Sequence, residues 1–187
     1  MQLFHGWKGL RLELAEYMRD NKISEEKFRF LGIYEWQNVY DKVLEHFVDE
    51  QYAGKYGLHW SNINGGFQKN IDKIYCFQMG IEPNCSYEWI EKLPEIVTCG
   101  KVYLFLEDAL LPKYWVAECS PAVVHLVIND TYGVEDYYIT DKKFNWLITE
   151  NHHDIITFLG RGLDLETIKR ICHNINHVEK ENNGVRI

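Results

Sequence analysis

The sequence predicts an α+β fold: a single domain with a mostly antiparallel sheet and helices packed on one face of that sheet. Two observations carry the prediction. Short runs rich in aromatic and β-branched residues follow one another closely from Lys101 onward, and polar turn residues separate them. Segments with apolar residues at helical spacing precede and interrupt these runs. Strands joined by short turns pair as hairpins, so the expected sheet is mostly antiparallel.

The N-terminal part, at about 1–98, is expected to be helical. Its clearest pattern runs from Ile33 to Gln51, where apolar residues recur every three or four positions. Pro94 should end or kink the last helix of this part. Glycines make 53–80 typical of a loop, with one short strand at Lys73–Met79. The expected helices are Trp7–Asn21, a short piece from Ser24 to Gly32, Ile33–Gln51 and Tyr87–Val97.

The sheet-containing part is expected at about 99–187. Ser120 and Pro121 are a typical helix start, with the serine as N-cap and the proline at the first helical position. Asp164 caps a last helix from Leu165 to about Val178. An apolar piece at Ile155–Leu159 precedes that helix. The expected strands are Lys101–Glu107, Lys113–Glu118, Asp136–Thr140 and Phe144–Glu150, with a short helix at Ala122–Asn129.

Length and charge limit the classes of function. A chain of 187 residues is about one domain, which we expect over 1–187. Lys and Arg total 20 against 28 Asp and Glu, a net charge of −8, which argues against nucleic acid or an anionic membrane as the partner. No apolar run follows Met1, no segment is long enough to span a membrane, and the five cysteines form no CxxC. A reducing cytoplasm is therefore expected.

The densest group of ionisable residues is Glu150-Asn151-His152-His153-Asp154. Strand alternation would place Glu150, His152 and Asp154 on one face, together with Trp146. Imidazole and carboxylate groups bind divalent metals or act as general bases, so His152, His153 and Asp154 are weak metal candidates. The structural alternative is that the histidines bond backbone groups at a strand end while Asp154 caps a turn. Further metal ligands would have to come from His59, His125, His173 or His177.

No complete catalytic constellation is present, and no cofactor is expected. Cys119 and Ser120 precede a helix N-terminus, where a thiolate would be stabilised, but burial and capping explain them better. No GxSxG, GxGxxG or GxxxxGK[ST] motif occurs. Surplus aromatics indicate protein binding instead, because Tyr and Trp are enriched at interfaces. The candidate binding residues are Trp115, Tyr137, Tyr138, Trp146 and the group Glu150, Asn151, His152, His153 and Asp154.

Three segments resemble a bacterial domain family of unknown function. They are Lys101–Asp108, Tyr114-Trp-Val, and Glu135–Asp154, the last matching the core "YYI…KK(F/Y)xWL…ENHHD". That family is similar to the small α+β proteins that act as immunity partners of secreted bacterial toxins. The resemblance covers about Lys101 to Gly162 and implies an α+β fold, a bacterial cytoplasmic origin and a shared ENHHD feature.

We therefore expect a cytoplasmic binding protein without catalysis, whose partner is a basic, toxin-like protein. Glu135, Asp136, Glu150 and Asp154 would form an acidic patch for it beside Tyr137 or Tyr138. The alternative is a metal-dependent or His/carboxylate acid–base enzyme that uses the Glu150–Asp154 cluster.

Overall fold

A computed structural model describes residues 9–58, 66–68, 71–77, 89–108, 114–130, 134–152, 155–172 and 175–178. Within these ranges, no helix combines the length and apolar character that a membrane span requires. The named elements, in chain order, are α1 (Gly9–Asp20), β1 (Phe28–Phe30), α2 (Trp36–Phe47), α3 (Glu50–Tyr56), β2 (Lys73–Phe77), α5 (Leu93–Ile96), β3 (Val102–Asp108), β4 (Tyr114–Cys119), α6 (Pro121–Asn129), β5 (Val134–Asp141), β6 (Trp146–Glu150), β7 (Ile155–Gly160), α7 (Leu165–Ile171) and β8 (Ile175–Val178).

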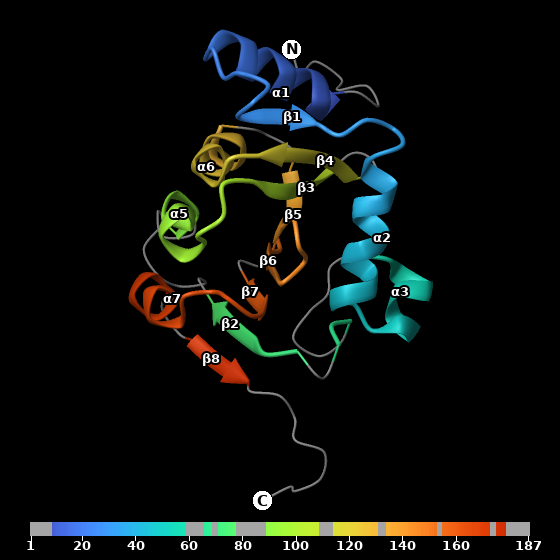
Figure 1. Cartoon of the computed structure of the whole chain (residues 1–187), viewed down its shortest axis with the longest axis vertical. Helices are drawn as coiled ribbons and strands as arrows, with labels where there is room; N and C mark the ends of the chain where they lie inside the picture. The colour runs from blue at the N-terminus through green and yellow to red at the C-terminus, as the bar shows by residue number, and fades with distance from the viewer. Residues whose placement is uncertain are drawn as a thin grey trace, which may run out of the picture.

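The described strands form one sheet in the order β1-β4-β3-β5-β6-β7-β2-β8, and all pairs are antiparallel (Figure 1). The α+β prediction is confirmed. All four expected strands are present, and the hairpin pairings β3–β4 and β5–β6 are those that the turn residues indicate. The apolar piece at Ile155–Leu159 is β7, and α6 begins at Pro121, although the Ser120 side chain makes no capping hydrogen bond.

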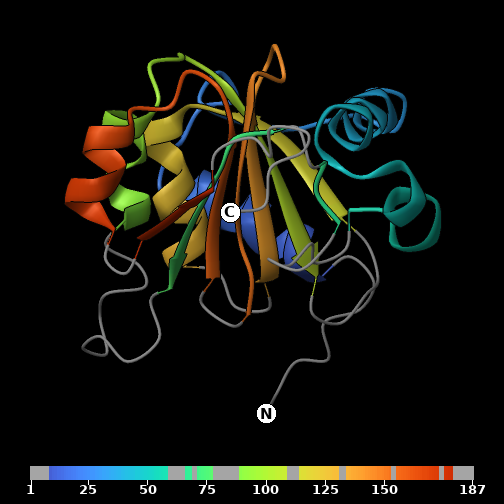
Figure 2. The same ribbon diagram turned by 90° about the horizontal axis from the view of Figure 1, so that it is seen from below.

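Helices cover both faces of this sheet, whereas one covered face was expected. Figure 2 shows α5, α6 and α7 against one face and α2 and α3 against the other. Strand alternation explains the division. Leu104 and Ile148 pack into the core beneath the first group, while Phe105 and Leu147, one position away, pack with α2. A sheet that is apolar on both faces requires a second layer of helices, and Ile33–Gln51 supplies it.

The described residues of the N-terminal part include strands β1 and β2, so this part is not purely helical. The piece expected as a helix from Ser24 to Gly32 contains β1, because Phe28, Arg29 and Phe30 pair with the edge of β4. The strand expected near Lys73 is β2, and it lies between β7 and β8. The sheet therefore combines strands from both expected parts of the chain.

Three predicted helices are shorter than expected. In the segment expected as a helix from Tyr87 to Val97, α5 covers only Leu93–Ile96, and Pro94 lies in its first turn rather than at its end. The Ile33–Gln51 helix ends at Phe47, because Val48 forms a bridge with Phe67 and Asp49 then caps α3. The last helix ends at Ile171, and the residues expected to continue it form β8 instead. Pairing of β8 with β2 is a long-range interaction that the local helical spacing does not reveal.

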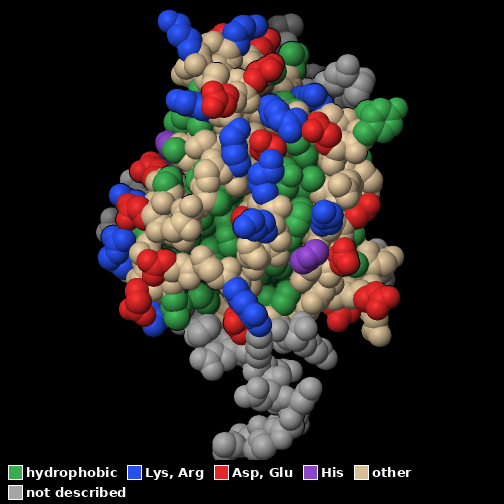
Figure 3. Space-filling view, in the orientation of Figure 1, with side chains coloured by type: hydrophobic (Ala, Val, Ile, Leu, Met, Phe, Trp, Pro, Cys, Tyr) green, Lys and Arg blue, Asp and Glu red, His purple; other side chains and the backbone are tan. Residues whose placement is uncertain are grey.

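The two ends of the sheet differ in charge. Because the strands run antiparallel, the start of β3, the β5–β6 turn and the end of β7 lie at one end. In Figure 3, Lys and Arg side chains gather down the middle of the face that presents this end. We call it the basic end, defined by Lys101, Lys142, Lys143 and Arg161. The opposite, acidic end is defined by Glu107, Asp108, Asp136 and Glu150.

Candidate functional site

Within the predicted ENHHD cluster, the described residues Glu150 and His152 make separate contacts. Strand β6 ends at Glu150, and the turn that follows takes His152 to the other face of the sheet. His153 and Asp154 lie outside the described residues. The alternation that would have aligned Glu150 with His152 is wrong, because the strand ends at Glu150 and His152 belongs to the turn that follows.

Glu150 is a buried carboxylate that two aromatic donors hold. The indole Nε1–H of Trp89 donates to Glu150 Oε2 at 2.9 Å, and the Tyr137 hydroxyl donates to the same oxygen. The two aromatic rings stack with centroids 6.3 Å apart. Tyr137 lies directly across the β5–β6 ladder from Glu150. These contacts assign Glu150 to the core rather than to an exposed acidic patch.

His152 pairs with Asp136. The His152 ring Nδ1–H and the His152 backbone N–H both donate to Asp136 Oδ1, at 3.0 and 2.9 Å. Asp136 is 1% exposed, whereas the side chain of His152 is 41% exposed. Asn151 accepts a hydrogen bond from the Ile155 backbone N–H at 3.2 Å. These contacts fix the β6–β7 turn, and among the described residues no group of three potential ligands could hold a metal.

The expected aromatic anchors are core residues. Trp115, Tyr137, Tyr138 and Trp146 are all buried, so a partner cannot contact them on the surface. Trp115 also donates through Nε1 to Asp108 Oδ2 at 3.3 Å. Of the named candidates that the structure describes, only His152 presents an exposed side chain.

A second buried polar group surrounds Tyr114 at the acidic end. Burial raises the pKa of this phenol, and the charges of Glu107 and Asp136 and the neighbouring Tyr40 raise it further. Its hydroxyl therefore stays protonated and forms a hydrogen bond with Tyr138. Of the remaining candidate ligands, His125 is half-buried on α6 and His177 belongs to β8, whereas His59 and His173 lie outside the described residues.

Among the residues that the structure describes, the most exposed large apolar side chains lie at the corner between β1 and α2. Ile33 is 74% exposed and Tyr34 is 92% exposed. The turn that carries them is closed by the Gly32 carbonyl, which accepts hydrogen bonds from the backbone N–H groups of Glu35 and Trp36 at 3.0 and 3.1 Å. A short, fully bonded turn therefore presents an aromatic side chain to solvent.

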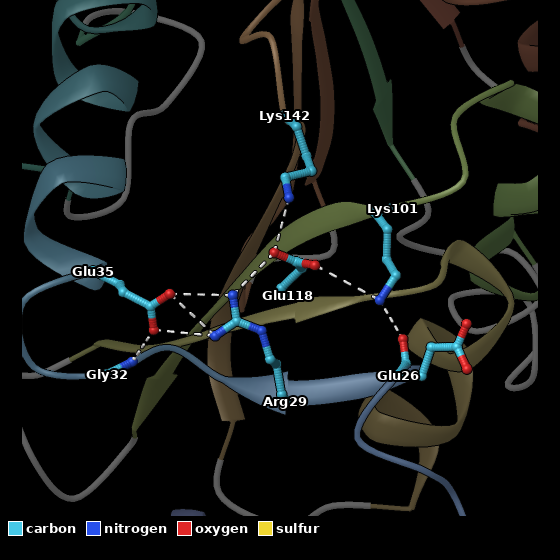
Figure 4. Close-up of polar contacts among 7 residues, drawn as sticks. All are labelled: Glu26, Arg29, Gly32, Glu35, Lys101, Glu118 and Lys142. Atoms are coloured by element: carbon cyan, nitrogen blue, oxygen red, sulfur yellow. Dashed lines mark hydrogen bonds and ion pairs between the residues drawn. The ribbon is translucent and has the colours of Figure 1, made fainter.

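Arg29 pins this turn to the sheet (Figure 4). Its guanidinium donates to both carboxylate oxygens of Glu35, at 3.0 and 3.2 Å, and the Gly32 backbone N–H donates to Glu35 Oε2 at 2.8 Å. The hydrogen bond from Arg29 is the main reason that the pKa of Glu35 is lowered, with the Gly32 N–H second. The bidentate geometry fixes the orientation of Glu35, and therefore that of the turn.

Glu118 joins the corner to the basic end. Arg29, Lys142 and Lys101 lie 3.2, 3.0 and 3.6 Å from its carboxylate oxygens (Figure 4). Burial alone would raise the pKa of Glu118, but the hydrogen bond and charge of Lys142, with the charges of Arg29 and Lys101, lower it overall. We call Ile33, Tyr34, Glu35, Arg29 and Glu118 the β1–α2 corner.

Sequence reasoning missed this corner. Ile33 and Tyr34 were assigned to the start of a long helix, where an apolar residue is usually buried. A usable signal was Gly32, which breaks the helical pattern, with Arg29 three residues before it and Glu35 three residues after it. The partners of Arg29 on β4, in contrast, are visible only in the fold.

One family profile matches residues 6–170, and its description is "Family of unknown function (DUF6756)". The chain belongs to this family. No curated protein and no solved structure matches the chain. The DUF6756 match extends far beyond the Lys101–Gly162 resemblance and includes α1, β1 and the whole β1–α2 corner. Both the corner and the buried groups at the acidic end are therefore parts of the DUF6756 domain.

Proposed function

We propose that this chain is a non-catalytic protein-binding module whose contact surface is the β1–α2 corner. The observation that carries the proposal is the exposure of Ile33 and Tyr34 on a turn pinned by Arg29. A tyrosine offers a large contact area with a polar tip, and such residues dominate interface energetics. Because the turn is already ordered, binding loses little conformational entropy there.

The partner implied by the resemblance to immunity proteins is a toxin-like protein. A net charge of −8 supports attraction of a basic partner over long range. Arg29 of the corner and the neighbouring Lys142 bond to Glu35 and Glu118, yet their side chains remain 38% and 46% exposed and offer additional contacts to carboxylates on that partner. The expected interface is a pocket that receives Tyr34 and has carboxylates at its rim.

Co-expression with the products of neighbouring genes tests this function. The chain is purified by an affinity tag, and the affinity of each retained protein is measured by calorimetry. Tyr34→Ser should lower the affinity at least 30-fold, because a central aromatic anchor contributes about 2 kcal/mol or more. The free energy of unfolding of the Tyr34→Ser variant should differ from that of the wild type by less than about 0.5 kcal/mol, since the side chain is exposed.

Leu12→Ser is the matched control, because Leu12 is 58% exposed on α1, outside the corner. This variant should bind like the wild type. Equal affinity of the wild type and Tyr34→Ser would exclude the corner as the contact surface. Retention of no neighbouring gene product would contradict the toxin-binding form of the proposal.

A further inference from the structure

A groove of about 550 Å³ lies between α1 and β1, at one edge of the sheet. Figure 1 shows α1 running alongside this edge strand. One wall carries Arg11 and Arg19 of α1, and the opposite wall is formed by Phe28, Arg29 and Phe30. The volume lies within the range of ligand-binding sites, and both walls are parts of regular elements.

The edge of β1 that faces away from β4 has open hydrogen-bonding positions. The Leu31 N–H donates to the Val116 carbonyl at 2.8 Å, and in an antiparallel ladder the groups of Phe28 and Phe30 then point to the other side. The Phe28 N–H bonds to the Ser24 carbonyl at 3.1 Å. Within the described part of the chain, no backbone–backbone hydrogen bond outside the regular elements uses the N–H or carbonyl of Phe30, which is partly exposed, whereas Phe28 is buried at 5% exposed. An extended segment can therefore add to the sheet here.

The groove is basic although the chain is acidic. The guanidinium of Arg29 is bonded to Glu35 and Glu118, so the charges left to the groove are Arg11 and Arg19 against Glu25, a local charge of +1, whereas the whole chain carries −8. The Arg11 guanidinium lies over the Phe30 ring, 4.9 Å from its centroid, so it is held in position by an aromatic contact. Charge complementarity therefore favours an acidic occupant.

The spacing of the two α1 arginines fits an extended segment. Arg11 and Arg19 are eight residues apart on one helix, which is about 12 Å at the helical rise. Side chains four positions apart on one face of a strand are about 13 Å apart. Two carboxylates at such positions would meet both arginines at once, with the second replacing the exposed contact at 3.0 Å between Arg19 and its neighbour Asp20.

We propose that this groove binds an extended acidic segment of a partner protein, which pairs with the free edge of β1 and places carboxylates at Arg11 and Arg19. The proposal goes beyond the proposed function, because the groove is separate from the Ile33–Tyr34 turn and its ligand has the opposite charge to the expected basic partner. The ligand is recognised by its backbone and by two acidic side chains.

The test is an NMR titration of the ¹⁵N-labelled full chain with the acetylated, amidated peptide Glu-Val-Thr-Val-Glu. The Phe30 amide proton should shift downfield as it gains a hydrogen bond. The double variant Arg11→Gln/Arg19→Gln should raise the Kd at least tenfold, because it removes both charge-assisted contacts. Arg161→Gln, at the basic end, is the matched control and should leave the Kd unchanged.

Two further peptides separate charge from strand pairing. Lys-Val-Thr-Val-Lys should not bind, and Glu-Pro-Thr-Pro-Glu should bind at least tenfold more weakly, because proline cannot donate to a ladder. An unshifted Phe30 amide, equal binding of either control peptide, or an unchanged Kd in the double arginine variant would overturn the proposal. Tyr34→Ser should bind the acidic peptide like the wild type, so the failure of one proposal is distinguishable from failure of the other.

Discussion

Glu118 is the residue on which the charged contacts of the corner converge. Its side chain is 12% exposed and accepts contacts from Arg29, Lys101 and Lys142. Removal of its charge would leave those three cations close together without their shared counter-charge. We expect Glu118→Gln to lower the free energy of unfolding at neutral pH by about 1–2 kcal/mol, as judged by urea denaturation.

The pH dependence of that loss has a defined sign. The pKa of Glu118 is lower in the folded chain than in the unfolded chain, where it is about 4.3. The stabilisation is therefore complete above about pH 4.3 and disappears as the pH falls through the folded pKa. The difference between the wild type and Glu118→Gln should narrow below pH 4. Glu16→Gln, an exposed site on α1, is the control, and a constant difference from pH 7 to pH 3 would contradict this account.

Individual side chains also explain why the predicted site could not be assembled from the sequence. Glu150 and His152 have the residue types of a functional cluster, yet each bonds to a partner remote in sequence, Trp89 or Asp136. Those partners depend on register and on where β6 ends. The structural alternative expected the His152 ring to bond a backbone group at a strand end, whereas the ring bonds the Asp136 carboxylate. The exposure of the Tyr34 side chain likewise depends on the fold and could not be predicted from the sequence.

At the scale of elements, the close approach of β6 and β7 depends on one glycine. Gly160 ends β7 opposite Trp146, with φ +93°. A β-carbon there would clash with the Asn145 carbonyl and lie 2.9 Å from Trp146 Cα. Gly160→Ala should therefore lower the free energy of unfolding by about 3 kcal/mol or more, because it strains the backbone and displaces the β5–β6 hairpin.

Gly162 is the matched control for that substitution. Its φ is also positive, +84°, but no atom lies within 4 Å of an added β-carbon. Gly162→Ala should lower the free energy of unfolding by only about 1 kcal/mol, because alanine disfavours the left-handed conformation. Thermal unfolding of both variants measures the difference, and equal losses would show that strain rather than contact decides the effect at Gly160.

The elements that the sequence predicts correctly are those with strong local signals. Strands β3 to β6 combine β-forming residues with polar turns, and α6 begins at Pro121 as expected. Strand β1 is only three residues long and follows a typical N-cap, Ser24, so its local signal favours a helix. Strand β8 retains helical spacing and is determined by β2, a strand about 100 residues earlier in the chain.

At the scale of the whole molecule, strands from both halves of the chain share one core. Cys119 of β4 and Cys172 after α7 are buried in the same apolar cluster, whereas Cys99 is half-buried. Burial raises the pKa of the Cys119 thiol, which lowers the fraction of reactive thiolate. The rate at which a reagent labels these thiols therefore reports how cooperatively the molecule unfolds.

We expect Cys119 and Cys172 to react only on global unfolding. Variants that retain one cysteine each, with the others replaced by serine, are labelled with a thiol reagent over a urea series. The rates for Cys119 and Cys172 should rise together and, without urea, should be at least about 10³-fold slower than for an unfolded chain. Cys99 should react faster, through local motion. Different urea dependences for the two buried thiols would indicate that the halves of the sheet open separately.

The separation of charge between the two ends of the sheet has a consequence for how partners approach. A strand of six residues is about 20 Å long, whereas mobile ions screen a charge over about 8 Å at physiological salt. Each end therefore produces a local potential that the other end scarcely alters. A partner that touches Lys101 and Lys142 therefore meets a cationic surface, whatever the charge of the whole chain. The carboxylates that define the opposite end are each no more than 8% exposed, so they act on a partner through their field and not through direct contact.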